Sequence, residues 1–139
     1  MPTKENKAIA RRYVEDIWNR GDLDTAHEIV APTIVFQGPI RKVEGLVNFV
    51  QYVKATRAVF PDLHFTVEDL IAEGDQVVIC WAMTGTHDSA FMGLAPTGKR
   101  FAVRGVSTAR LEGGTIAGID LYWDRLDMVE QLGASLNAN

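Results

Sequence analysis

The most regular pattern in the chain lies in residues 81–124, WAMTGTHDSAFMGLAPTGKRFAVRGVSTARLEGGTIAGIDLYWD. Apolar and polar residues alternate over 79–87, 100–111 and 115–124, and segments rich in Gly and Pro separate these runs. Alternation with a period of two, bounded by turn residues, is typical of strands in an antiparallel meander. Three consecutive long strands predict a curved sheet. Its concave face must be filled by other segments or by a ligand.

The segments on either side predict helices and further strands. Apolar residues recur every three or four positions over 3–19, which indicates an amphipathic helix, and Asp22 is a candidate N-cap for the helix that follows. The predicted elements are helix 3–19, helix 23–30, strand 33–37, helix 44–60, strands 63–72, 77–87, 100–111 and 115–124, and helix 126–132. This order predicts one α+β domain over residues 1–139, with helices on one side of an antiparallel sheet.

Composition argues against several classes of partner. The net charge is −4 and no basic run is present, so we expect no nucleic-acid partner. The single cysteine, Cys80, lies in an apolar strand and is interpreted as a small buried hydrophobe. The N-terminus is polar and no apolar run is long enough for a bilayer, so we expect a cytoplasmic protein without a membrane partner. His27, His64 and His87 are scattered, which predicts no metal site.

Several short motifs resemble a known family. They are Gly85-Thr86-His87, Phe91-Met92-Gly93, Pro96-Thr97-Gly98-Lys99, Arg110 and Ile116 on either side of a turn, Trp123-Asp124 and Glu130-Gln131-Leu132-Gly133. With the segment from Trp18 to Asp22, they span nearly the whole chain. In these motifs the sequence is similar to the SnoaL-like polyketide cyclase and ester cyclase family of the NTF2-like superfamily.

The resemblance implies an NTF2-like cone, in which a curved antiparallel sheet wraps around an apolar cavity closed by N-terminal helices. It also implies chemistry without a cofactor: an intramolecular aldol closure on a hydrophobic, polycyclic or ketonic small molecule. The family's cyclases use a His and an Asp on the last two strands. Counted from Arg110 and the turn, these positions are Ser107 and Leu121 here.

Two other residues are therefore the candidate catalytic groups. His87 shares strand parity with Trp81 and Met83, so it would face the cavity as a base or as a hydrogen-bond donor. The alternative is a histidine that anchors the following loop. Asp120 is next to Leu121, and only a β-bulge would turn it inward.

A larger set of residues is predicted to line the cavity and contact a ligand. Aromatic side chains offer large contact areas, and buried polar tips need partners that a ligand could supply. The set is Trp18, Phe36, Gln37, Phe49, Tyr52, Trp81, Met83, Ser107, Leu121 and Trp123. For each aromatic member the alternative is an ordinary place in the core.

The sequence leaves more than one function open. The first hypothesis is a cofactor-independent enzyme that transfers a proton on a hydrophobic small molecule. The others are a binding protein that keeps the cavity without the chemistry, and a hydroxylase-type relative. We also expect a homodimer through the outer face of the sheet, because Val78, Val106 and Tyr122 would otherwise be exposed together.

Overall fold

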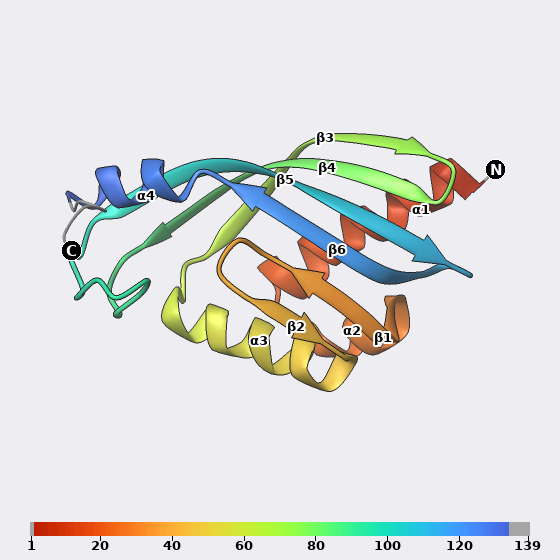
Figure 1. The fold of residues 1–139 in the computed structure, drawn as a ribbon, viewed down its shortest axis with the longest axis horizontal. Helices are drawn as coiled ribbons and strands as arrows, with labels where there is room; N and C mark the ends of the chain where they lie inside the picture. The colour runs from red at the N-terminus through yellow and green to blue at the C-terminus, as the bar shows by residue number, and fades with distance from the viewer. Residues whose placement is uncertain (1, 134–139) are drawn as a thin grey trace.

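The computed structural model describes residues 2–133, except for the side chain of Pro2, as a curved sheet with helices on its concave side (Figure 1). The elements are α1 Pro2–Arg12, the π-helix η1 Tyr13–Asn19, α2 Leu23–Ile29, β1 Val30–Gln37, β2 Lys42–Glu44, α3 Leu46–Val59, β3 His64–Glu73, β4 Gln76–Thr86, β5 Arg100–Glu112, β6 Thr115–Trp123 and α4 Arg125–Gln131. The sheet order is β2-β1-β6-β5-β4-β3. This arrangement confirms the α+β class. Within residues 2–133, no helix is both long and apolar enough to span a lipid bilayer.

Strands β3 to β6 form the antiparallel meander that the alternation predicted. Every second residue of β4 points into the concave face and is buried: Val77, Ile79, Trp81, Met83 and Gly85. Trp81 pairs with Gly105 on β5, and Gly105 pairs with Trp123 on β6. The Trp81 and Trp123 side chains therefore lie on one surface on either side of Gly105, because a period of two keeps them on the same side of the sheet.

The first helix differs from the prediction in its second half. Residues 3–19 were predicted as one amphipathic helix, whereas the chain changes at Tyr13 from an α-helix to a π-helix. In an α-helix, residues five positions apart lie about 140° apart around the axis. The wider π-helix brings Tyr13 and Trp18 to the same buried side. Asp22 then caps α2 as predicted, because its side chain accepts a hydrogen bond from Thr25 N at 3.2 Å.

The pairing of β1 was not predicted. β1 lies parallel to β6, with Phe36 opposite Ile119, and antiparallel to the short strand β2. β2 escaped prediction because it has only three residues, of which Val43 alone is buried. The sheet is therefore mixed, with one parallel pair beside four antiparallel ones.

Helix α3 closes the open side of the curved sheet. Phe49 and Val53 are fully buried on its inner face. Near its C-terminal end, Arg57 donates hydrogen bonds to the backbone carbonyls of Trp18 at 2.6 Å and Asn19 at 2.8 Å. Because these carbonyls belong to the last residues of η1, one side chain satisfies the end of one helix and fixes a second helix against it.

Candidate functional site

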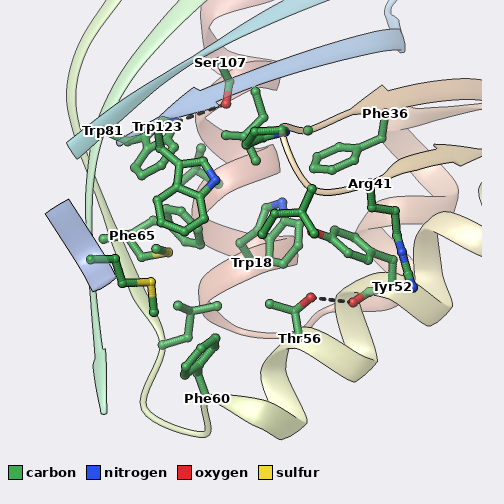
Figure 2. Close-up of a pocket in the computed structure, with 18 of the residues that line it drawn as sticks. Trp18, Phe36, Arg41, Tyr52, Thr56, Phe60, Phe65, Trp81, Ser107 and Trp123 are labelled. Atoms are coloured by element: carbon green, nitrogen blue, oxygen red, sulfur yellow. Dashed lines mark hydrogen bonds between the residues drawn. The ribbon is translucent and has the colours of Figure 1, made fainter. Parts of the chain in front are cut away.

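A cavity of about 80 Å³ lies between the concave face of the sheet, η1, α3 and the loop 38–41 (Figure 2). Its wall is formed by Tyr13, Val14, Trp18, Phe36, Gly38, Pro39, Ile40, Arg41, Tyr52, Thr56, Phe60, Leu63, Phe65, Trp81, Met83, Phe91, Ser107, Leu121, Trp123 and Met128. Most of these side chains are apolar or aromatic, and Arg41 is the charged one. A wall of this kind suits an apolar ligand that carries few polar groups.

The size of the cavity limits what it accepts in this conformation. Sites for drug-sized ligands have volumes of about 300–1,000 Å³, several times the 80 Å³ found here. A polycyclic ligand therefore requires part of the wall to move outward. The loop 38–41 is the segment best placed to do so, because Pro39, Ile40 and Arg41 line the cavity from an exposed position.

Trp81 and Ser107 form a buried polar pair on the cavity wall. The indole Nε1 of Trp81 donates a hydrogen bond to Ser107 Oγ at 3.0 Å, and both residues are at most 5% exposed. Gly105 makes this arrangement possible, since a Cβ there would lie 2.4 Å from two carbons of the indole. Ser107 uses its oxygen as an acceptor for Trp81, so its own hydroxyl hydrogen remains available to a ligand.

Ser107 is directly opposite Leu121 in the pairing of β5 with β6, and both residues line the cavity. The two positions that the family resemblance marks as catalytic thus lie side by side on the wall. One carries a hydroxyl group and the other a hydrocarbon. The resemblance implies a histidine and an aspartate at these two positions, and this chain has neither there.

Three further polar side chains reach the cavity from the helices and the loop 38–41. Burial raises the pKa of the Tyr13 phenol, while a hydrogen bond from Trp18 acts in the opposite direction. Burial also raises the pKa of Tyr52, while a hydrogen bond with Thr56 and the nearby Arg41 charge act to lower it. Both phenols therefore stay protonated at neutral pH and can donate hydrogen bonds. The Arg41 guanidinium carbon lies 5.9 Å from the centre of the Tyr52 ring, within cation–π range.

His87 holds the loop that follows β4. It is fully buried, its backbone bonds to Lys99 O, Thr97 N and Gly98 N, and its Nδ1 accepts from Thr97 N at 3.2 Å. Because a backbone N–H can only donate, Nδ1 carries a lone pair and the proton of a neutral ring lies on Nε2. Nε2 is buried without a hydrogen-bond partner within the described chain. His87 is not among the residues of the cavity wall; its geometry matches the loop-anchoring alternative.

Two predicted site residues face away from the cavity, and a third lies behind its wall. Gln37 is exposed and bonds to the carbonyl of Gly38 at 2.9 Å, because its neighbour Phe36 takes the inward position of β1. Asp120 is exposed on the outer face opposite Thr108, and the irregularity of β6 lies before Gly118 and does not turn Asp120 inward. Phe49 is fully buried, where it packs against Phe36 and Tyr13 as part of the core. The other predicted lining residues all reach the cavity.

Sequence patterns missed Tyr13 and Arg41 as site residues. Tyr13 belongs to the apolar stripe of the first helix, and its periodicity could have marked it as inward-facing. Arg41 gives no such signal, since it lies in an irregular loop whose position depends on β1 joining β6. Long-range pairing of this kind leaves no local pattern.

The cavity can supply hydrogen-bond donors but not an acidic or imidazole base from its own wall. Its titratable side chains are Tyr13, Tyr52 and Arg41, all of which carry protons at neutral pH. Within residues 2–133, no cluster of His, Cys, Asp or Glu is arranged to hold a metal ion. The absence of a metal requirement stays a prediction.

Comparison with known proteins identifies the family. The model of the SnoaL-like polyketide cyclases matches residues 8–132. The chain therefore belongs to the SnoaL-like polyketide cyclase family, as its motifs predicted. A search among curated proteins finds no match.

Solved structures agree with this assignment. A candidate SnoaL-like polyketide cyclase from Jannaschia sp. CCS1 is 25% identical, with a TM-score of 0.87 over 96% of this chain and 94% of that one. AclR from Streptomyces galilaeus, a candidate hydroxylase, is 29% identical, with a TM-score of 0.79 over 94% and 97%. A protein of ketosteroid isomerase-like fold from Catenulispora acidiphila is 18% identical, with a TM-score of 0.79 over 94% and 96%. The predicted NTF2-like fold is confirmed.

Proposed function

We propose that this protein is a cofactor-independent enzyme that binds an apolar ketone in the cavity and promotes proton transfer at the carbon beside the carbonyl. This is the step that begins an intramolecular aldol closure. The observation that carries the proposal is the buried Trp81–Ser107 pair on a mostly apolar wall. A donor held in place in a water-poor site stabilises the oxyanion of an enolate far better than water does.

Ser107 is the donor that we assign to the substrate oxygen. The Trp81 N–H bonded to its oxygen withdraws electron density and strengthens the hydroxyl as a donor, since linked hydrogen bonds polarise one another. Tyr13 and Tyr52 are protonated and hold further oxygens of a ketonic ligand. Leu121 cannot accept the proton and His87 lies off the cavity wall, so we assign that role to a water molecule at the exposed mouth near Arg41.

A non-catalytic binding protein is the second candidate. The observation that favours it is Leu121, a hydrocarbon on the cavity wall opposite Ser107 at the position of the family's aspartate. Such a protein would retain the apolar cavity and its donors but leave the substrate unchanged. The name of AclR, a candidate hydroxylase, adds hydroxylation as a further possibility for this chain.

Hydrogen–deuterium exchange separates enzyme from binder. We expect the protein in D₂O to accelerate exchange at the methyl group of 2-acetonaphthone, an apolar ketone, above the buffer rate, as measured by proton NMR. Leu121→Asp places a carboxylate beside Ser107 and should raise the exchange rate further. A well-placed base typically increases a rate by a factor of about 10²–10⁴. If calorimetry shows binding while exchange stays at the buffer rate, the binder is the correct function.

We also propose a homodimer through the outer face of the sheet. Tyr122 is 63% exposed there, and its cross-strand neighbour Val106 pairs in turn with Cys80. Ile71, 54% exposed, pairs with Val78 in the adjacent cross-strand row of the same face. Burying such a patch against a second copy removes it from water.

Sedimentation equilibrium at micromolar concentration should therefore give the mass of a dimer, and Val106→Glu should give the mass of a monomer. Val47→Glu is the control, because Val47 is 75% exposed on α3 away from this face. A wild-type protein that sediments as a monomer would rule out the interface.

A further inference from the structure

Arg41 brings a positive charge to the mouth of an otherwise uncharged cavity. It is the charged member of the wall, and no aspartate or glutamate belongs to that wall. Arg41 also borders an open groove outside the cavity, together with Lys42, Glu44 and Tyr52. The Glu44 carboxylate there pairs with Lys42 at 3.8 Å. The guanidinium therefore lies where an apolar interior meets water.

Seven other arginines already have hydrogen-bond or ion-pair partners within the protein. Arg11, Arg12, Arg20, Arg100, Arg104 and Arg110 pair with carboxylates, and Arg57 bonds to backbone carbonyls. Within residues 2–133 Arg41 has the Tyr52 ring as its contact and no carboxylate partner. In the same part of the chain Arg125 lacks one too, but its side chain is exposed at the start of α4 and does not line the cavity. An unpaired guanidinium on a cavity wall is suited to bind an anion from a ligand.

We propose that the ligand of this cavity is an apolar acid, whose carboxylate is bound by Arg41 while its ring system lies inside. This inference rests on the proposed function in one respect, that the cavity is the ligand site. It adds a second group to the ketone of the proposed function: the ligand is an aromatic or polycyclic carboxylic acid that also carries the ketone and enters with its charged end outermost.

The arrangement of the wall gives the ligand one orientation. Figure 2 shows Arg41 and Tyr52 on one side of the cavity and Phe60 toward another side, with Trp18 between them. Met83 and Met128 also belong to the wall. An acid bound in the reverse sense would bury its carboxylate away from Arg41, the charged member of the wall, and a buried anion without a charged partner is unfavourable.

The shape of the guanidinium also matters. Arginine presents a planar fork that holds both oxygens of a carboxylate, whereas lysine offers a single compact charge. The Tyr52 ring beside Arg41 packs in turn against Phe36 on the cavity wall. Tyr52, kept protonated by its raised pKa, does not repel an anion there.

Calorimetry with two matched probes tests the inference. 2-Naphthoate and 2-acetonaphthone have the same rings and nearly the same shape, but only the first is charged. We expect Arg41→Gln to lower the affinity for 2-naphthoate by about 10–100-fold, the range for a hydrogen bond to a charged group. The affinity for 2-acetonaphthone should change by less than about twofold. Arg41→Lys should keep part of the preference.

Lys42→Gln is the matched control. It removes one positive charge from the next residue, which borders the outer groove but not the cavity. Exposed charges contribute little, so both probes should keep their affinity within about twofold. An equal loss in both variants would show a general effect of charge and overturn the inference.

The outcomes separate this inference from the proposed function. If 2-acetonaphthone binds but 2-naphthoate binds no more tightly, or if Arg41→Gln affects both alike, the inference that the ligand is an acid is wrong. The cavity then remains the ligand site. If neither probe binds the wild-type protein, the cavity is not the ligand site, and both proposals fall together.

Discussion

Replacing Ser107 with alanine is expected to lower the protein-catalysed exchange of the 2-acetonaphthone methyl group by about 10²–10³-fold, the usual cost of removing one oxyanion donor. The hydroxyl lies on the cavity wall and accepts the Trp81 N–H at 3.0 Å. Alanine removes the donor to the substrate and leaves that N–H without its acceptor. The measurement is the exchange rate in D₂O at saturating ketone, so that weaker binding does not imitate slower chemistry.

Two variants control this experiment. Thr108→Ala removes a hydroxyl from the next residue of β5, which points to the outer face, and should leave the rate unchanged. Trp81→Phe keeps the Ser107 hydroxyl but removes the N–H that polarises it, and should give a smaller loss than Ser107→Ala. A Ser107→Ala protein that exchanges at the wild-type rate would move the oxyanion site to Tyr13 or Tyr52.

Replacing Trp81 with alanine is expected to lower the free energy of unfolding by about 3–5 kcal/mol, the usual range for truncation of a buried aromatic residue. Trp81 is 3% exposed and packs edge to face on Phe65, with ring centres 5.2 Å apart. Its indole also covers Gly105, where a side chain would collide with it. Removal of the ring leaves a space that the neighbouring strands cannot close, because their register is fixed by hydrogen bonds. Urea unfolding followed by circular dichroism measures the change.

Trp123→Ala is the matched control. Trp123 lines the same cavity from β6, but it is only partly buried. The free energy of unfolding that is lost on truncating a side chain scales with the volume left empty and with the apolar area that had been removed from water. We therefore expect a clearly smaller loss for Trp123→Ala. Equal losses for the two variants would contradict the assignment of Trp81 as the central packing residue of the wall.

The sequence predicted the elements where local patterns determine them. The alternation of β4 correctly placed Trp81 and Met83 inward, and Asp22 correctly marked the start of α2. Local rules worked here because strand parity and helix capping depend only on residues a few positions apart. The motif-based family assignment succeeded for a related reason, since turns with fixed spacing constrain the fold at several points.

The site was harder to predict because its parts meet through distant contacts. Gln37 was placed in the cavity beside Phe36, although adjacent residues of a strand face opposite sides. His87 had the predicted parity, but it lies at the end of β4 under the following loop, and parity does not say how far along the strand the cavity extends. Tyr13 and Arg41 depend on a π-helix and on a loop held by a parallel strand pair, which no short pattern indicated.

The parallel pairing of β1 with β6 also affects the order in which this chain can fold. β3, β4, β5 and β6 each pair with a strand next to them in the sequence, so the meander can form by pairing of consecutive strands. β1 must wait for β6, because Val30 and Ile116 come together across most of the chain. During synthesis on the ribosome, η1 can dock on β3 through the hydrogen bonds of Asn19 with Phe65 once β3 has emerged, whereas β1 can reach its place beside β6 only when nearly the whole polypeptide has left the exit tunnel. We therefore expect the loop between β1 and β2, which carries Arg41, to reach its final place on the cavity wall late in folding.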